Sequence, residues 1–282
     1  MGPHNGRQPL ESLGARNRRL VDLRRLVGHR RERQSRGLFV LDGERLIADA
    51  LGAGIELVEV FHDEEATREA SMRRLLAEAQ ADGVAVTPVV AGVLQRIVDP
   101  VSPRPIAAVA VMPPEAELAA AASGGDVLVL DGVGDPGNLG TLIRTAEAAG
   151  CAMVCVCGAA TDPFSPKAVR ASAGSILRVP VSMSASPGEC LAQLQAAGFT
   201  VIGTKADAPS FADQVWPEHV ALVLGSESHG VSESAGSAVD DWVSIPMAPQ
   251  VESLNVAVAG SVLVFALAQS RRTGSGPGGT AR

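Results

Sequence analysis

Short hydrophobic runs alternate with helical segments throughout the second half of the chain, and this alternation constrains the fold more than any other feature. Strands are predicted at residues 127–131, 152–156, 177–181, 200–203, 220–224 and 242–245, and helices at 138–149, 166–173, 188–197 and 253–269. Runs that are hydrophobic throughout are typical of parallel strands buried on both faces. The sequence therefore predicts an α/β domain whose parallel sheet is covered by helices on both sides.

The first half of the chain predicts a smaller α/β module that begins with a basic helix over residues 13–33. A segment rich in proline, alanine and glycine then separates the two halves. From these composition shifts we expect a flexible leader over residues 1–13, an N-terminal domain over 14–111, a linker over 112–125, a second domain over 126–272 and a disordered tail over 273–282.

Composition and apolar runs exclude several classes of protein. The longest apolar candidate, residues 256–268, is too short to span a membrane, and the N-terminus lacks the apolar stretch of a secretory signal. Of the four cysteines, Cys151, Cys155 and Cys157 lie in or beside one predicted strand, where we expect them to serve as small hydrophobic residues rather than metal ligands. We therefore expect a cytoplasmic protein that binds neither a membrane nor a metal.

The charge of the chain is unevenly distributed. The net charge is −7, yet residues 14–36 hold nine arginines against two acidic residues, which is +7 in 23 residues. A basic block on an acidic body is typical of a surface that binds phosphates, although a solvated arginine-rich helix is the alternative. The candidate contacts are Arg16, Arg18, Arg19, Arg24, Arg25, Arg30, Arg31, Arg33 and Arg36. With six Phe, two Trp and no Tyr, the chain is not expected to stack bases on aromatic side chains.

Three motifs carry the candidate chemistry, and the first is GVGDPGNLGTLIR at residues 132–144. It formally matches the glycine pattern of a dinucleotide-binding fold. Pro136, however, removes a backbone donor from the turn that would hold a pyrophosphate, and no acidic residue follows the next strand at the position that binds ribose. An NAD-binding oxidoreductase is thus a disfavoured alternative. Asn138 is instead predicted to cap a helix, with Arg144 nearly two turns further along.

The second and third motifs also follow predicted strands. LGSESHG, at residues 224–230, ends a buried strand in a turn where Gly225 permits close approach of a ligand to the backbone and Glu227 follows two residues later. The third motif runs from IPM at residues 245–247, through a loop, to SLNV at residues 253–256. Ser253 is predicted to be the N-cap of the last helix.

In this order and spacing, the three motifs resemble the signatures of the SpoU/TrmH family, RNA ribose 2′-O-methyltransferases of the SPOUT class that use S-adenosylmethionine. The resemblance implies a C-terminal SPOUT domain with a deep trefoil knot, S-adenosylmethionine as methyl donor, no metal, and a homodimer. The segment GLFVLDGERLIADAL, residues 37–51, resembles the substrate-binding domain of members that act on ribosomal RNA, a domain similar to RNA-binding ribosomal proteins.

This resemblance implies methylation of a ribose 2′-hydroxyl in large-subunit (23S) ribosomal RNA, for housekeeping or for antibiotic resistance. A tRNA substrate and a non-catalytic RNA-binding protein are the alternatives. The basic block of residues 14–36 then becomes the predicted RNA contact. The nucleotide that is methylated does not follow from the sequence.

The resemblance also assigns residues to the site. Catalytic roles are implied for Asn138, Arg144, Glu227, Ser253 and Asn255. Contacts with the methyl donor are implied for Thr204, Leu224, Gly225, Ile245, Met247, Ser253 and Leu254, several of them through backbone groups. Arginine is a poor proton acceptor, so we expect Arg144 to hold a phosphate bidentately. The resemblance also allows the alternative that Arg144 is the general base. Glu147 is expected to orient Arg144 or to lie in a surface pair.

Overall fold

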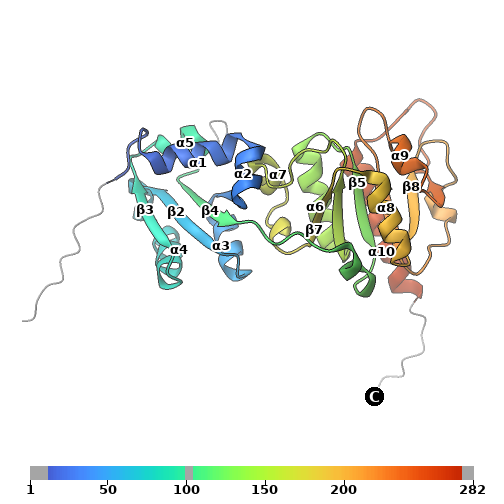
Figure 1. Cartoon of the computed structure of the whole chain (residues 1–282), viewed down its shortest axis with the longest axis horizontal. Coiled ribbons are helices and arrows are strands. Elements are labelled where there is room, and N and C mark those ends of the chain that lie inside the picture. Colours follow the sequence, from blue (N-terminus) through green and yellow to red (C-terminus); the bar gives the residue numbers. More distant parts are fainter. Residues whose placement is uncertain (1–11, 99–103, 275–282) are drawn as a thin grey trace, which may run out of the picture. The chain divides into compact units, whose positions relative to one another are not determined.

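The computed structural model describes residues 12–98 and 104–274, which belong to two compact units (Figure 1). One unit comprises Met1–Pro113 with Phe164–Pro166, and the other comprises Pro114–Pro163 and Lys167–Arg282. Most of the predicted leader and tail, residues 1–11 and 275–282, lies outside the described residues. Among the residues that are described, no helix is long and apolar enough to cross a membrane.

The first unit is a four-stranded sheet with helices on both faces (Figure 1). Its strands β1 (Leu38–Asp42), β2 (Leu57–Asp63), β3 (Ala85–Val89) and β4 (Ile106–Val111) lie in the order β1-β4-β2-β3. Strand β4 pairs antiparallel with β1 and β2, whereas β2 and β3 are parallel. Helices α1 (Arg18–Gly28) and α5 (Val93–Val98) cover one face, and α3 (Glu44–Gly52) and α4 (Ala70–Ala81) cover the other.

The basic segment of this unit differs from the single helix that the sequence predicts. Helix α1 ends at Gly28, His29 has an extended backbone, and α2 (Arg30–Arg36) follows. Arg33 is only 3% exposed and donates hydrogen bonds to the carbonyl oxygens of Leu26 at 2.6 Å and Val27 at 3.1 Å. Since these carbonyls belong to the last turn of α1, Arg33 is a structural residue, and its prediction as an RNA contact is wrong. The other eight arginines of the block are exposed.

At each end of the described residues, a short segment belongs to regular structure although the sequence predicts a flexible leader and a disordered tail there. The N–H of Leu13 donates to the carbonyl of Pro88 at 2.9 Å, and the carbonyl of Leu13 accepts from Val90 at 3.1 Å. Helix α10 (Val256–Gly274) likewise includes the first two residues assigned to the tail. Backbone hydrogen bonding therefore extends the regular structure by one or two residues at each end.

The second unit is built on a parallel sheet, as predicted. Strands β5 (Val127–Asp131), β6 (Met153–Cys157), β7 (Val181–Ser184), β8 (Thr200–Thr204), β9 (Val220–Leu224) and β10 (Asp241–Val243) lie in the order β10-β8-β9-β5-β6-β7. Every neighbouring pair among them is parallel. Helices α6 (Pro136–Ala149) and α10 pack together on one face, and α8 (Pro187–Ala196) with the short α9 (Glu233–Gly236) covers the other.

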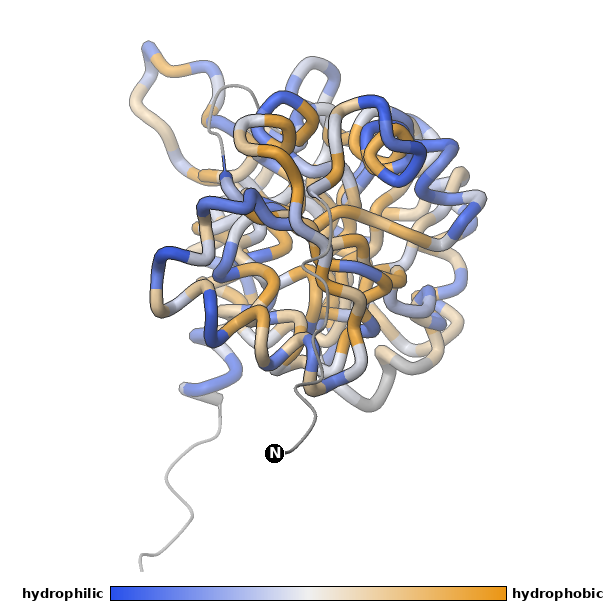
Figure 2. The backbone as a smooth tube through the Cα atoms, turned by 90° about the vertical axis from the view of Figure 1, so that its left-hand side faces the viewer, coloured by the Kyte–Doolittle hydropathy of each residue, from blue (hydrophilic) through white to orange (hydrophobic). Residues whose placement is uncertain are grey.

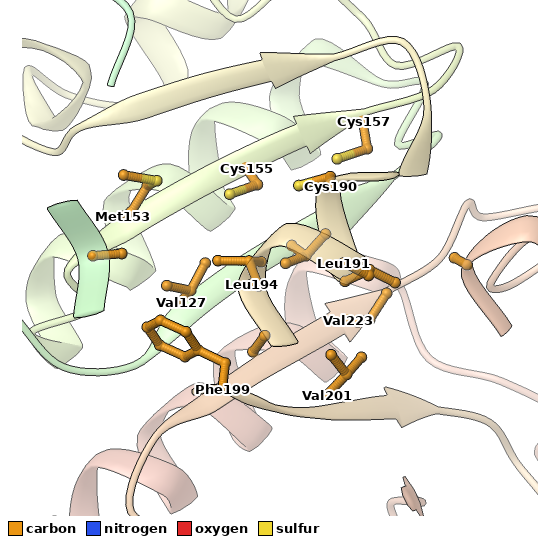
Figure 3. Packing of buried hydrophobic residues seen from close by; sticks show 14 residues of the cluster. Val127, Met153, Cys155, Cys157, Cys190, Leu191, Leu194, Phe199, Val201 and Val223 are labelled. Atoms are coloured by element: carbon orange, nitrogen blue, oxygen red, sulfur yellow. The ribbon is translucent and has the colours of Figure 1, made fainter. Parts of the chain in front are cut away.

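A hydrophobic cluster fills the space between this sheet and α8 (Figure 3). The side chains of Cys155 and Cys157 on β6 lie beside Cys190 on α8 (Figure 3), and all three residues are at most 1% exposed. Contact with the Cys190 thiol, together with burial, raises the pKa of Cys155 and of Cys157. Both therefore stay neutral and pack as small hydrophobic residues, as predicted. Figure 2 shows the same division along the backbone, with hydrophobic segments inside and hydrophilic residues on outer turns.

The strand order brings distant loops together at one edge of the sheet. Strand β5 pairs with β9, although three other strands of the sheet, β6 to β8, lie between them in the chain. Strands β6 and β7 lie on one side of this pair, and β8 and β10 lie on the other. Open α/β sheets bind ligands beyond the carboxyl ends of their strands at such a reversal. The loops after β5 and β9 hold the first two sequence motifs.

Candidate active site

Helix α6 positions the first motif, and Asp135 caps this helix instead of the predicted Asn138. The Oδ1 atom of Asp135 accepts hydrogen bonds from the backbone of Gly137 at 2.7 Å and of Asn138 at 2.9 Å. Pro136 occupies the first helical position, which tolerates proline because its N–H would be unpaired there. The side chain of Asn138 is thereby free for other contacts. The Asp135 carboxylate also occupies the N–H groups that would bind a pyrophosphate, which contradicts the dinucleotide alternative.

Three side chains from three separate motifs form one hydrogen-bonded network. Asn138 donates from Nδ2 to Oε1 of Glu227 at 2.8 Å, and Asn255 donates from Nδ2 to Oδ1 of Asn138 at 3.1 Å. The second oxygen of Glu227 accepts from the backbone of Gly134 at 3.2 Å. Because Glu227 accepts only and Asn255 presents its amide hydrogens, the orientation of the Asn138 amide is fixed.

Asn255, rather than Ser253, is the N-cap of the last helix, α10. Oδ1 of Asn255 accepts from the backbone of Ala257 at 2.9 Å and of Val258 at 3.3 Å, which is the geometry of an N-cap. The prediction of Ser253 as the cap is therefore wrong. Ser253 is exposed two residues earlier, and its hydroxyl makes no hydrogen bond with any residue that the structure describes. It is thus available to a bound molecule.

The environment of Glu227 keeps it ionised. Partial burial acts to raise the pKa of Glu227, but hydrogen bonds from Asn138 and from the backbone, including Gly134, outweigh burial and lower the pKa below its usual range. A carboxylate with a lowered pKa and both oxygens occupied is a weak proton acceptor. Its role in the network is to hold Asn138.

Arg144 lies near the network but outside it. Its side chain is exposed on α6 and makes no ion pair or hydrogen bond with the part of the chain that is described. Glu147 does not orient it, because both oxygens of Glu147 bind Arg178, one of them at 3.0 Å from Nη2. The hydrogen bond from Arg178 also lowers the pKa of Glu147. The prediction that Glu147 orients Arg144 is therefore wrong, and Glu147 lies instead in a pair with Arg178. Arg144 is left free to bind an anion.

A hollow of about 850 Å³, its open mouth included, lies beside the network. Its walls come from the ends of β8 and β9, the loop after β10 and the start of α10. All seven residues predicted to contact the methyl donor line it: Thr204, Leu224, Gly225, Ile245, Met247, Ser253 and Leu254. Glu227 lines it too, whereas Asn138, Arg144 and Asn255 do not. Sequence reasoning missed several further wall residues, among them Val243, Ala259 and Leu263.

The wall of this hollow fits S-adenosylmethionine in its chemistry. The backbone groups of Ile245, Met247 and Leu254 form no hydrogen bonds within the described residues, so their donors and acceptors are free for an adenine ring. Leucine and valine side chains on the same wall supply an apolar surface. Small ligands bind in hollows of this kind, largely apolar with a few placed polar groups.

The loop after β9 can take its shape only with glycine at position 225. A Cβ atom there would lie 1.9 Å from the carbonyl carbon of Gly230. The loop closes through two hydrogen bonds between the backbones of Ser226 and Gly230, at 2.9 and 3.0 Å. Thr204, opposite, donates its hydroxyl hydrogen to the carbonyl of Val223 at 3.0 Å and keeps its lone pairs for a ligand. Within the described residues, no group of three potential ligands is placed to hold a metal.

Comparison with known proteins decides the family. Residues 126–265 match the SpoU rRNA Methylase family, and residues 17–108 match the MRM3-like substrate binding domain. A 23S rRNA (guanosine(2553)-2′-O)-methyltransferase, RlmP of Bacillus subtilis, is 32% identical over 254 residues, which are 90% of this chain and 97% of that protein.

The chain belongs to the SpoU rRNA methylase family.

Other members agree over nearly the whole length. The 23S rRNA (uridine(2479)-2′-O)-methyltransferase of Streptomyces viridochromogenes is 30% identical over 270 residues, 93% of each chain. The crystal structure of the SpoU methyltransferase AviRb from the same organism, in complex with AdoMet, has a TM-score of 0.82 at 28% identity and covers 92% of this chain and 99% of that one. An AdoMet-bound rRNA methyltransferase from Sinorhizobium meliloti has a TM-score of 0.78 at 28% identity, with coverages of 91% and 95%.

Proposed function

We propose that this member of the SpoU family methylates a ribose 2′-hydroxyl of 23S ribosomal RNA, with S-adenosylmethionine as the methyl donor. The observation that carries the proposal is the convergence of Asn138, Glu227 and Asn255 at the rim of a hollow lined by Glu227 and Ser253. Two relatives that match over at least nine-tenths of the chain are named for 23S ribosomal RNA. A domain of the substrate-binding type precedes the site.

S-adenosylmethionine supplies an electrophilic methyl group when it is bound. We assign the residues of the hollow to holding it: Gly225, Ile245, Met247 and Leu254 through backbone groups, with Leu224 and Thr204 beside them. None of these six residues is ionisable, and the charged residues of the hollow, Lys205, Glu227 and Glu252, have other places on its wall. Asn138, Ser253 and Asn255 then face the position where a ribose would enter.

The remaining roles concern the RNA. Asn138 keeps one amide hydrogen after its bond to Glu227, and the free hydroxyl of Ser253 lies on the wall of the hollow, so both are assigned to the ribose. Arg144, which has no partner among the described residues, is assigned to the phosphate next to that ribose, where its planar guanidinium binds two oxygens at once. Arg16 and the exposed arginines of α1 and α2 are assigned to other phosphates of the RNA.

We also propose that the protein is a cytoplasmic homodimer that pairs through α10. Three apolar side chains are exposed on this helix: Val258 at 51%, Val262 at 39% and Phe265 at 44%. They lie at helical spacing on one face, which a second copy would cover. Sedimentation of the wild type and of Phe265→Asp tests the dimer. A monomeric wild type would refute it.

The function is tested by transfer of tritiated methyl groups. Purified protein is incubated with labelled donor and either unmodified 23S ribosomal RNA or unmodified tRNA, and the modified nucleotide is mapped. We expect label in 23S RNA at a single ribose, and none with Asn138→Ala. If only tRNA is labelled, the substrate is tRNA and not 23S ribosomal RNA. Donor binding with no methylation of either RNA would reject the proposal and favour a non-catalytic RNA-binding protein.

A further inference from the structure

Lys167 lies beside the candidate active site, and none of the roles assigned above uses it. It is on α7 (Pro166–Ala171), and its Nζ donates to Oδ2 of Asp135 at 3.0 Å. The hydrogen bond from Lys167 and that from the Asn138 backbone lower the pKa of Asp135. The side chain of Lys167 is nevertheless 61% exposed. An ammonium group has three donors, so a second acceptor has room to bind.

Packing between α6 and α7 sets the position of this ammonium group. A Cβ atom at Gly140 of α6 would lie 2.4 Å from the carbonyl oxygen of Ala168 and 2.6 Å from Cβ of Ala171. Glycine therefore lets the two helices approach to backbone contact. Since α7 is held along its length against α6, Lys167 at its start is held beside the first turn of α6.

Lys167 and Arg144 lie along the same face of α6. A Cβ atom at Gly137 would be 3.8 Å from Cε of Lys167, so Lys167 reaches the side of α6 that Gly137 occupies. Arg144 follows Gly137 by seven residues, two helical turns or about 10 Å along the axis, and so projects from the same side. Thr141 and Ala148 share this face and are exposed, and it carries no acidic residue.

These two cations stand out against the charge of their surroundings. Residues 114–282 contain sixteen acidic and eight basic side chains. Arg178 and Arg271 are in close ion pairs with Glu147 and Asp126, as Lys167 is with Asp135, whereas Arg144 has no ion pair among the described residues. Lys167 also neutralises Asp135, which would otherwise repel a phosphate at the start of α6.

We propose that Lys167 and Arg144 form a phosphate-binding track along α6 that binds successive phosphates of the RNA strand carrying the target ribose, with Asp135 as the residue that positions Lys167. This inference rests on the proposed function only in taking RNA as the ligand. An RNA strand laid along this face would bring a ribose to Asn138, which is one residue beyond Gly137. The track thus acts on RNA binding and not on the methyl donor.

The test measures the affinity for unmodified 23S ribosomal RNA as a function of salt. Each phosphate contact contributes roughly 0.7 to 0.9 to the slope of log Kd against log salt. Lys167→Gln is expected to weaken binding several-fold and to lower the slope by about that amount, whereas Lys167→Arg should retain both. Calorimetry with S-adenosylmethionine should give wild-type affinity for both variants.

Arg272→Gln is the matched control for charge. Arg272 is exposed, and its neighbour Arg271 binds Asp126 at the start of β5, so it lies at the opposite edge of the sheet. This variant should keep the wild-type slope.

A wild-type slope and RNA affinity in Lys167→Gln would overturn the inference. A loss of thermal stability in that variant with an unchanged slope would also overturn it, because the lysine would then stabilise α6 and bind no RNA phosphate. If wild type binds RNA without methylating it, the proposed function fails while a reduced slope still supports the track.

Discussion

Asn255 makes two separable contributions, and substituting it distinguishes them. Its Oδ1 caps α10 through Ala257 and Val258, and its Nδ2 donates to Asn138. Asn255→Asp retains the capping oxygen and replaces the donor with a second carboxylate oxygen. Asn255→Ala removes both groups. If the two roles are as described, Asn255→Ala will lose more stability and Asn255→Asp will lose more activity.

The magnitudes follow from the contacts. Loss of the cap in Asn255→Ala costs about 1 kcal/mol, which lowers Tm by roughly 2–4 °C in a unit of this size. Asn255→Asp keeps the cap and places a negative charge at the positive end of the helix, which stabilises by about 0.3–1 kcal/mol. It also faces a carboxylate toward Oδ1 of Asn138, which cannot turn away because its amide is bound to Glu227.

An acceptor left facing another acceptor costs about 1–3 kcal/mol, equivalent to a loss of roughly 5- to 150-fold in kcat/KM for methyl transfer. In Asn255→Ala, water can bind Asn138, so its loss should lie at the low end. Differential scanning fluorimetry and initial rates with 23S RNA measure the two effects. The reasoning is refuted if Asn255→Asp loses as much Tm as Asn255→Ala and keeps wild-type kcat/KM.

Three other predictions concern packing, pH and the basic block. Gly260→Ala should lower the free energy of unfolding by about 1–3 kcal/mol and weaken donor binding, because the new Cβ would lie 2.4 Å from leucine side chains of both α6 and β9; an unchanged Tm and donor Kd would contradict this close contact. The pKa of Glu227 is lowered by folding, so its contribution to stability is present above the ordinary glutamate pKa near 4.3 and is lost as the pH falls through the folded value. The stability that Glu227 contributes should therefore be constant from about pH 8 to about pH 5 and be lost only in stronger acid, as thermal unfolding against pH would show, and a loss near neutrality that depends on Glu227 would count against it. Arg33→Ala should lower Tm, since it leaves helix carbonyls unpaired at a cost of about 1–3 kcal/mol, and should not change the salt slope of RNA binding. Arg24→Ala should lower the slope and leave Tm unchanged. Identical behaviour of the two variants would argue against a structural role of Arg33.

Much of the fold followed from the sequence because the relevant signals are local. Continuous hydrophobic runs predicted the parallel strands, and β5, β6 and β9 lie within a residue of their expected positions. The strand expected at 177–181 instead spans Val181–Ser184, after a short 3₁₀ turn. The helix Val93–Val98 was missed because six residues are too few to show a helical period.

Helix caps show where local reasoning is insufficient. Asn138 and Ser253 are good caps by residue type, yet Asp135 and Asn255 occupy those positions. A proline at the first helical position, preceded by aspartate, was a usable signal for Asp135. For α10 the sequence offers both Ser253 and Asn255, and packing of α10 against α6 and β9 decides between them. The knot implied by the family remains a prediction.

By itself, the sequence determined the class of most elements and the three motifs, since these depend on residue type and on spacing along the chain, and the resemblance of the motifs to a known family implied the residues that line one hollow. Only the tertiary structure decided that Asn138 bonds to Glu227 and Asn255, that Glu147 turns to Arg178, and that Arg33 is buried. Such choices depend on which strands are neighbours and on which atoms lose contact with water, and neither quantity is a property of any single segment.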